Sequence, residues 1–350
     1  MCIRDRNIIM KQIKGITNVK SLRNGAGSIK GIGKEIGKFI ITTMEVPWQI
    51  VKNDIGGQPE DIIFIDDVDQ NVLDDILLNI PAIDSVVGIG GGMAIDAAKY
   101  FSWKKQLRLI SIPTIVSVDA FLTPAAGVRV NNRVKYVGNS SPDPLIIDYS
   151  IIRTAPKTLN IAGVGDLLSI HTASFDWEHA ENNGLSEFPF TQDSVIAGQK
   201  IIDGLYNSIG EIKKVTNRGI DAIVEGYMYL NTICLPAGHF RIEEGSEHYL
   251  FYELEERLQR PFIHGHIVGL GIFCMSQLQK NNSEYIIEFM DSVCLDYHPK
   301  GMNINKDDLT ASLLNLKNYV DTNSHLWYTI INSSDINEEW IKDITNNLNF

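Results

Sequence analysis

The sequence is poor in cysteine and in positive charge, and it has no long hydrophobic run. Its four cysteines, Cys2, Cys234, Cys274 and Cys294, show neither C-x-x-C spacing nor a disulfide-framework pattern, so we expect reduced thiols. Lys and Arg total 31 against 43 Asp and Glu, and the resulting net charge of −12 disfavours nucleic-acid binding. No apolar stretch approaches the ~20 residues of a membrane span, and no apolar signal segment opens the chain. We therefore expect a cytoplasmic protein without a membrane span or nucleic-acid partner.

The chain of 350 residues, 44% of them hydrophobic, is long enough and apolar enough for two globular domains. Its opening MCIRDR resembles nothing that follows, and we exclude Met1–Arg6 as a cloning or start-site remnant. The first half alternates apolar runs with helical patterns, which is typical of a parallel α/β sheet. The expected strands are Lys38–Thr43, Asp61–Asp66, Asp84–Gly90, Leu107–Ile112 and Leu145–Asp148.

The second half reads as helical. Its expected helices are Val195–Tyr206, Asp221–Cys234, Val268–Leu278, Ser283–Val293 and Asp307–Tyr319. The predicted organisation is therefore an α/β domain over residues 7–153 and an all-α domain over residues 154–350.

Two glycine-rich stretches are candidates for binding a phosphate. The glycines between Gly25 and Gly33 precede a strand, whereas a dinucleotide-binding turn follows one, so we interpret them as turns. Gly90, Gly91 and Gly92 end an apolar strand and open an Ala-rich helix, where backbone N–H groups can cradle a pyrophosphate. A tight strand-to-helix turn explains these three glycines equally well.

Polar residues also follow the next strand, at the sheet edge where ligands of α/β proteins bind. Thr114, Ser117 and Asp119 can hold a ribose, a phosphate or a polyol hydroxyl, or they can satisfy backbone donors of the loop.

One acid and two histidines suggest a metal site in the second half. Asp166 fits a helix N-cap, but together with His248 and His264 it would form an open three-ligand site of the catalytic kind. The two histidines are 16 residues apart, which is too far for one helix face but suits two neighbouring helices.

Five ordered blocks carry a family resemblance: GIGGGMAIDAAKY, SIPTIVSVDAF, GVGDLL, GSEH and FIHGHIVGLG. They resemble the superfamily that includes glycerol dehydrogenase, iron-containing alcohol dehydrogenases, sn-glycerol-1-phosphate dehydrogenase and dehydroquinate synthase. The resemblance implies a dehydroquinate synthase-like fold, in which an α/β NAD(P)-binding domain precedes a helical metal-binding domain. It also implies an active site in the cleft between them and a homo-oligomer.

The resemblance assigns roles to individual residues. Asp166, His248 and His264 match the ligands of a divalent metal, for which Zn²⁺ suits the donors and Fe²⁺ or Ni²⁺ are alternatives. Asp119 matches a residue that touches the substrate hydroxyls. The residues that match the NAD or NADP site are Gly90, Gly91, Gly92, Asp96, Lys99, Thr114 and Ser117.

GVGDLLSIHTASFDWEHA and GSEH look most like the sn-glycerol-1-phosphate dehydrogenases, which reduce dihydroxyacetone phosphate. The sequence departs from that pattern with Ser117-Val118-Asp119-Ala120 in place of S-H-D-G, and with His266 where a glutamate is frequent. The hypothesis is metal-assisted, NAD(P)-linked hydride transfer on a small polyol phosphate. The alternatives are a glycerol or other polyol dehydrogenase, a sugar-phosphate cyclase, and a catalytically silent nucleotide-binding member.

Overall fold

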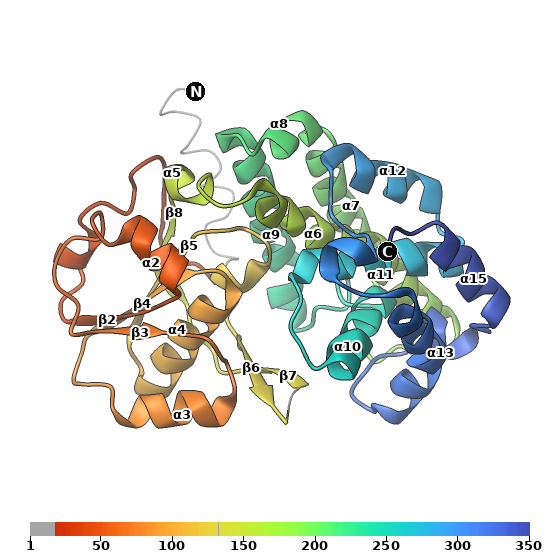
Figure 1. Cartoon of the computed structure of the whole chain (residues 1–350), viewed down its shortest axis with the longest axis horizontal. Coiled ribbons are helices and arrows are strands. Elements are labelled where there is room, and N and C mark those ends of the chain that lie inside the picture. Colours follow the sequence, from red (N-terminus) through yellow and green to blue (C-terminus); the bar gives the residue numbers. More distant parts are fainter. Residues whose placement is uncertain (1–17, 132) are drawn as a thin grey trace. The chain divides into compact units, whose positions relative to one another are not determined.

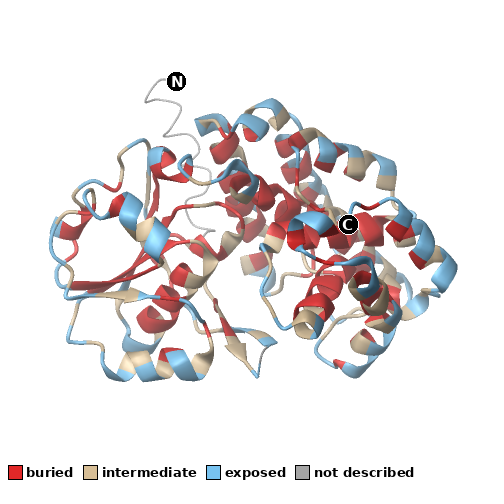
Figure 2. Ribbon diagram, in the orientation of Figure 1, coloured by how far each residue is buried: buried red, intermediate tan, exposed pale blue. Residues whose placement is uncertain are grey.

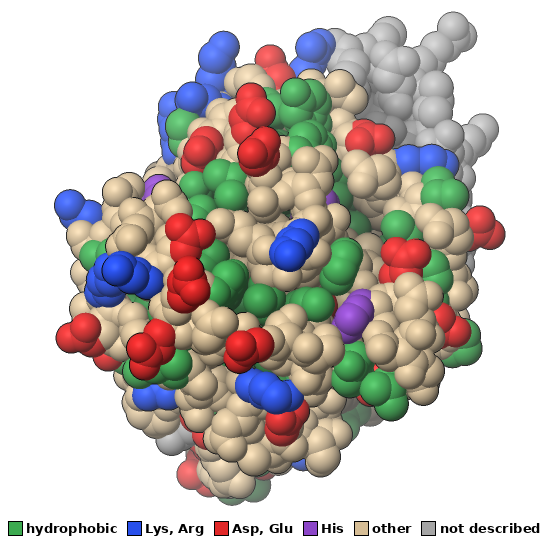
Figure 3. Space-filling view, turned by 90° about the vertical axis from the view of Figure 1, so that its right-hand side faces the viewer, with side chains coloured by type: hydrophobic (Ala, Val, Ile, Leu, Met, Phe, Trp, Pro, Cys, Tyr) green, Lys and Arg blue, Asp and Glu red, His purple; other side chains and the backbone are tan. Residues whose placement is uncertain are grey.

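The computed structural model describes residues 18–131 and 133–350, so Met1–Arg6 and Cys2 lie outside the described residues. The chain divides into two compact units after Asn160, seven residues beyond the boundary expected at residue 153 (Figure 1). Among the described helices, none has the length and apolar character that crossing a membrane requires. The face in Figure 3 carries acidic and basic side chains interspersed rather than one large patch of a single sign.

Unit 1 is built on a six-stranded, all-parallel sheet, as the alternating pattern predicts. Each of the five expected strands is present, with ends shifted by a few residues. The additional strand β1 is only three residues long and lies at a sheet edge. In spatial order the strands are β1 (Leu22–Asn24), β8 (Pro142–Ile147), β5 (Arg108–Pro113), β4 (Ser85–Gly90), β2 (Phe39–Thr43) and β3 (Asp61–Phe64).

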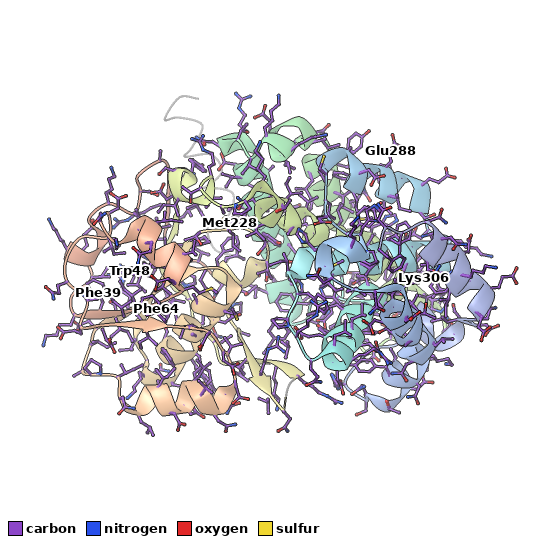
Figure 4. All side chains as sticks on the ribbon, viewed as in Figure 1. Phe39, Trp48, Phe64, Met228, Glu288 and Lys306 are labelled. Atoms are coloured by element: carbon purple, nitrogen blue, oxygen red, sulfur yellow. The ribbon has the colours of Figure 1, made fainter. Side chains whose placement is uncertain are left out.

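Alternating side chains of the central strands enter two apolar clusters, one on each face of the sheet. Phe39 of β2 belongs to the first cluster, and Trp48 packs against it (Figure 4). The second cluster includes Ile40 and residues of the helices that cover the opposite face. Figure 2 shows the buried strands between more exposed helices. This layered core is the reason that strands buried on both faces read as nearly continuous apolar runs.

Short helices and a hairpin complete unit 1. Gly27 and Gly31 have positive φ values of 73° and 76°, which supports their interpretation as turn residues. The remaining elements of unit 1 are η1 (Ile32–Lys34), α2 (Glu45–Val51), α3 (Gln70–Leu78), α4 (Gly92–Lys105), η2 (Asp119–Phe121), β6 (Ala126–Val130), β7 (Arg133–Val137) and α5 (Tyr149–Ile152).

Unit 2 is helical, which confirms the predicted class, and all five expected helices are present. The 26-residue helix α6 (Lys157–Asn182) was not predicted; it begins in unit 1 and continues into unit 2. The other helices are α7 (Gln192–Tyr206), α8 (Ile209–Lys214), α9 (Asn217–Ala237), α10 (Ser246–Leu258), α11 (His264–Gln279), α12 (Ser283–Val293), η3 (Pro299–Met302), α13 (Lys306–Thr322), α14 (Ile330–Ser333) and α15 (Glu338–Asn346).

Candidate metal centre and nucleotide loop

Three helices of unit 2 bring one acid and two histidines together. Asp166 lies inside α6 and not at a helix N-cap, while His248 is in the first turn of α10 and His264 is the first residue of α11. One ligand atom from each lies within 4.8 Å of the others. The sequence spacing therefore indicated the right arrangement: the histidines occupy neighbouring helices joined by a loop.

The separations within this cluster suit a single small cation. Asp166 Oδ1 lies 2.9 Å from His264 Nε2 and 3.8 Å from His248 Nε2, and the two imidazole nitrogens are 3.3 Å apart. Ligands that bind a tetrahedral Zn²⁺ at ~2.0–2.1 Å lie about 3.3 Å from one another. Three donors at this spacing leave a fourth position open, which is the form of a catalytic site rather than a structural one.

Tyr227 and Glu247 orient two of the three clustered side chains through hydrogen bonds. Tyr227 donates a hydrogen bond of 3.0 Å to Asp166 Oδ2, which leaves Oδ1 facing the histidines. His248 Nδ1 lies 2.9 Å from Glu247 Oε1, so the imidazole donates there and its Nε2 lone pair faces the cluster. A carboxylate behind a ligating histidine fixes its tautomer and raises its basicity. The donor set and its support fit a divalent metal.

The surroundings of Asp166 and His248 favour the charged forms of both side chains. Burial raises the pKa of Asp166, but the neighbouring His264 and His248 and the hydrogen bond from Tyr227 outweigh it and hold that pKa below its usual value. Burial lowers the pKa of His248, but the hydrogen bond to Glu247 and nearby carboxylates raise it above its usual value. The carboxylates of Asp166 and Glu247 place negative charge beside the imidazoles, and this charge attracts a cation.

Glycines let the three helices approach closely beside the cluster. A Cβ atom on Gly165, next to Asp166, would lie 2.0 Å from the carbonyl oxygen of Gly265, next to His264. A Cβ on Gly271 of α11 would lie 2.3 Å from the carbonyl oxygen of Glu247 in α10. Backbone contact at these points sets the distances between the ligand atoms.

The glycine loop of unit 1 lies where the sequence places it, between β4 and α4. Gly90 has a φ of 152°, and a Cβ there would lie 2.9 Å from the side chain of Ala94. Gly91 is the N-cap of α4 and supplies no capping side chain, so the first N–H groups of this 14-residue helix lack a side-chain cap. A loop of this kind fits a pyrophosphate, because only glycine brings the ligand so close to the backbone.

The polar loop after β5 lies near these glycines. Thr114 N–H donates to the Gly90 carbonyl oxygen at 2.9 Å, which ties the two loops together. Thr114 and Ser117 are buried, and Asp119 opens η2 with its carbonyl oxygen accepting from Leu122 N–H. The parallel sheet thus brings the two loops to the same edge.

Asp96 and Lys99 of α4 contact each other. Lys99 is 1% exposed, and its Nζ lies 2.8 Å from Asp96 Oδ1 and 3.3 Å from Thr123 Oγ1. Burial raises the pKa of Asp96 against the effect of Lys99 and a hydrogen bond from Gly127 of the β6–β7 hairpin. This pair therefore links α4 to the chain that follows β5.

Residues outside the predicted site show what could and could not be found from the sequence. His171 Nε2 lies 2.7 Å from the Asn281 carbonyl oxygen and His179 Nε2 lies 2.8 Å from Ser333 Oγ, so their ring nitrogens have partners away from the metal ligands. Tyr227 and Glu247, which contact Asp166 and His248, were not predicted. Glu247 adjoins a ligand in GSEH and could have been suspected, whereas nothing in the sequence marks Tyr227.

The chain is similar to several known dehydrogenases. The family described as iron-containing alcohol dehydrogenase matches residues 60–156. The chain is 28% identical over 232 residues to glycerol-1-phosphate dehydrogenase [NAD(P)+] of Aeropyrum pernix, covering 66% of this chain and 65% of that relative. It is also 28% identical over 313 residues to the protein of the same name from Pyrobaculum neutrophilum, covering 85% of this chain and 89% of the relative.

Solved structures show the same fold. A probable glycerol dehydrogenase from Sinorhizobium meliloti 1021 superposes with a TM-score of 0.69 at 20% identity, covering 93% of this chain and 95% of that one. At this identity the likeness concerns the fold: a parallel-sheet unit followed by a helical unit.

Proposed function

We propose that this chain is a member of the iron-containing alcohol dehydrogenase superfamily, that it is an NAD(P)-dependent oxidoreductase acting on CH–OH groups, and that it interconverts sn-glycerol-1-phosphate and dihydroxyacetone phosphate. The observation that carries the proposal is the cluster of Asp166, His248 and His264, whose donor atoms have the spacing of one divalent ion. The substrate is proposed from the names of the two archaeal relatives.

In the proposed reaction, the residues of unit 2 hold the metal and orient its ligands. Tyr227 fixes the Asp166 carboxylate, and Glu247 fixes the His248 ring so that Nε2 faces the ion. A divalent ion, proposed to be Zn²⁺ from the two nitrogens and one oxygen, polarises a substrate C–O group when bound.

The residues of unit 1 are proposed to hold the nicotinamide cofactor, which gives or takes the hydride. Gly90, Gly91 and Gly92 provide space and backbone donors for the pyrophosphate. The other proposed roles follow from the family resemblance: Thr114 and Ser117 line the cofactor site, and Asp119 meets the substrate hydroxyls. We propose that Lys99, which is buried against Asp96, supports this site through Asp96.

The test is to follow NAD(P)H formation after metal reconstitution. sn-Glycerol-1-phosphate and glycerol are offered side by side, each with NAD and with NADP. A preference for the phosphorylated substrate supports the proposal, and the His264→Ala variant should then bind less metal and lose at least ~100-fold in activity. A preference for glycerol indicates a plain polyol dehydrogenase. Absence of NAD(P)H formation with both substrates would favour a sugar-phosphate cyclase or a catalytically silent member. Full metal content in the variant would contradict the assignment of His264.

A further inference from the structure

Helix α10 carries His248 in its first turn but begins without a capping residue of its own. Its N-cap is Gly245, which has no side chain to accept a hydrogen bond from the first N–H groups. Ser246 N–H, the first of them, donates instead to Asp176 Oδ2 at 2.8 Å. Asp176 belongs to α6, so the cap is supplied by another helix.

The contacts at the N-terminus of α10 also explain why residue 245 is a glycine. A Cβ on Gly245 would lie 2.8 Å from Asp176 Oδ2 and 3.0 Å from Glu247 Oε2, so two carboxylates fill the space that a side chain would need. Gly245 N–H donates to Glu247 Oε1 at 2.7 Å, and this oxygen also accepts from His248 Nδ1. The start of α10 and the orientation of the His248 ring are therefore set by one group of contacts.

Asp176 is itself held in place. It is fully buried, and its Oδ1 accepts a 2.9 Å hydrogen bond from Ile330 N–H. The buried guanidinium of Arg241 donates to the carbonyl oxygens of Asp176, Tyr328 and Glu244. Segment 327–330 and the loop before α10 are thus fastened to the same point of α6.

We propose that Asp176 is a positioning residue for the metal centre: by capping α10 from α6, it fixes where His248 presents Nε2 to Asp166. This inference rests on the proposed metal centre. Asp166 and Asp176 are ten residues apart on α6, about 15 Å along the helix. Helix α6 therefore meets α10 twice, once at the metal ligand and once at the cap, and the two contacts define the orientation of α10.

The experiment measures Zn²⁺ affinity of the full-length Asp176→Asn variant by competition with a chelator. An asparagine accepts at one oxygen only and turns an NH₂ toward the second backbone N–H, so one of the two hydrogen bonds is lost. We expect the dissociation constant for Zn²⁺ to rise about 10- to 100-fold. At saturating Zn²⁺ the KM for the polyol substrate should stay unchanged, and activity should return as added metal refills the site.

A second variant removes the hydrogen bond between Ser246 N–H and Asp176 from the side of α10. Ser246→Pro deletes the donating N–H at the first helical position, where proline is tolerated, and leaves Asp176 intact. We expect it to weaken Zn²⁺ binding as Asp176→Asn does, with the double variant little worse than either single one. This variant tests the proposal even where Asp176→Asn fails to fold. Asp291→Asn in α12, which weakens a 2.9 Å hydrogen bond donated by Tyr297, is the control and should bind Zn²⁺ normally.

The outcomes separate the positioning role from a merely structural one. A folded Asp176→Asn protein with a lower melting temperature but wild-type Zn²⁺ affinity overturns the inference and leaves the proposed metal centre standing. Absence of Zn²⁺ binding by the wild-type protein overturns both.

Discussion

Asp148 shows how one carboxylate supports the fold of unit 1. It is fully buried and accepts hydrogen bonds from the backbone N–H groups of Gly27, Ile29 and Ser150 at 3.0–3.1 Å. Burial raises its pKa, but the hydrogen bonds from Ser150, Ile29 and Gly27 outweigh this and hold the pKa below its usual value. Because the pKa is lower in the folded state, this group stabilises the protein above its unfolded pKa near 4, and that contribution is lost as the pH falls.

We therefore expect Asp148→Asn to destabilise unit 1 by about 2–3 kcal/mol at pH 7, because the neutral amide cannot accept all three N–H groups. The difference from wild type should shrink as the pH falls below about 4. Urea unfolding at several pH values measures both effects. Asp69→Asn is the matched control, since asparagine caps the exposed start of α3 as well as aspartate does. A pH-independent loss in Asp148→Asn would contradict the charge argument.

The residues of the proposed metal cluster could be predicted because Asp and His are common metal ligands and because these three lie in blocks that resemble the superfamily's ligand blocks. Asp166, His248 and His264 were found in this way, although the alternative for Asp166, a helix N-cap, proved wrong. Tyr227 and Asp176 could not be predicted. Their contacts with Asp166 and Ser246 join residues 61 and 70 positions apart in sequence and arise only when the helices pack.

At the scale of elements, the close approach of α6 and α11 sets the geometry of the proposed metal site. Gly165→Ala would place a Cβ 2.0 Å from a backbone oxygen of α11, which cannot move without displacing the helix. We expect this variant to lose ~1–3 kcal/mol of stability and at least ~10-fold in Zn²⁺ affinity. Thermal unfolding and chelator competition measure the two effects.

Gly204→Ala in α7 provides the comparison, because no heavy atom would lie within 4 Å of its new Cβ. Alanine costs less conformational entropy in a helix, so this variant should gain about 0.5–1 kcal/mol. Equal behaviour of the two variants would show that the close contact at Gly165 does not control the metal site.

Elements with regular patterns were predicted well, and those without them were not. Helix α12 has the predicted ends Ser283 and Val293. Helix α6 was missed because nearly every residue from Asn160 to Ala180 is buried, so the sequence lacks the alternation of polar and apolar faces that reveals a helix.

At the scale of the whole molecule, the residues proposed to bind the metal and those proposed to bind the nucleotide belong to different units. The three residues proposed to bind the metal all lie in unit 2, whereas Gly90, Gly91 and Gly92, proposed to bind the nucleotide, lie in unit 1. In hydrogen exchange by mass spectrometry, we expect Zn²⁺ to slow exchange mainly in α10 and α11, and NAD to slow it mainly over β4 and the start of α4. Ligand binding suppresses the local opening through which amides exchange.

The metal-free protein and His264→Ala with added Zn²⁺ are the controls, and both should lack the protection of α10 and α11. Protection of α10 by NAD in the absence of metal, with none over β4, would contradict the assignment of the nucleotide to unit 1.

The path of α6 has a consequence for protein engineering. The compact units separate between Asn160 and Ile161, yet this point lies inside a continuous helix that bears Asp166 a little further on. A chimaera joined there would require helical turns from two parents to continue in phase, and an error of one residue would rotate the carboxylate by about 100°. A junction in the turn at Thr154–Pro156 keeps the helix and its ligand from one parent, so it is the better place to recombine this chain with a homologue.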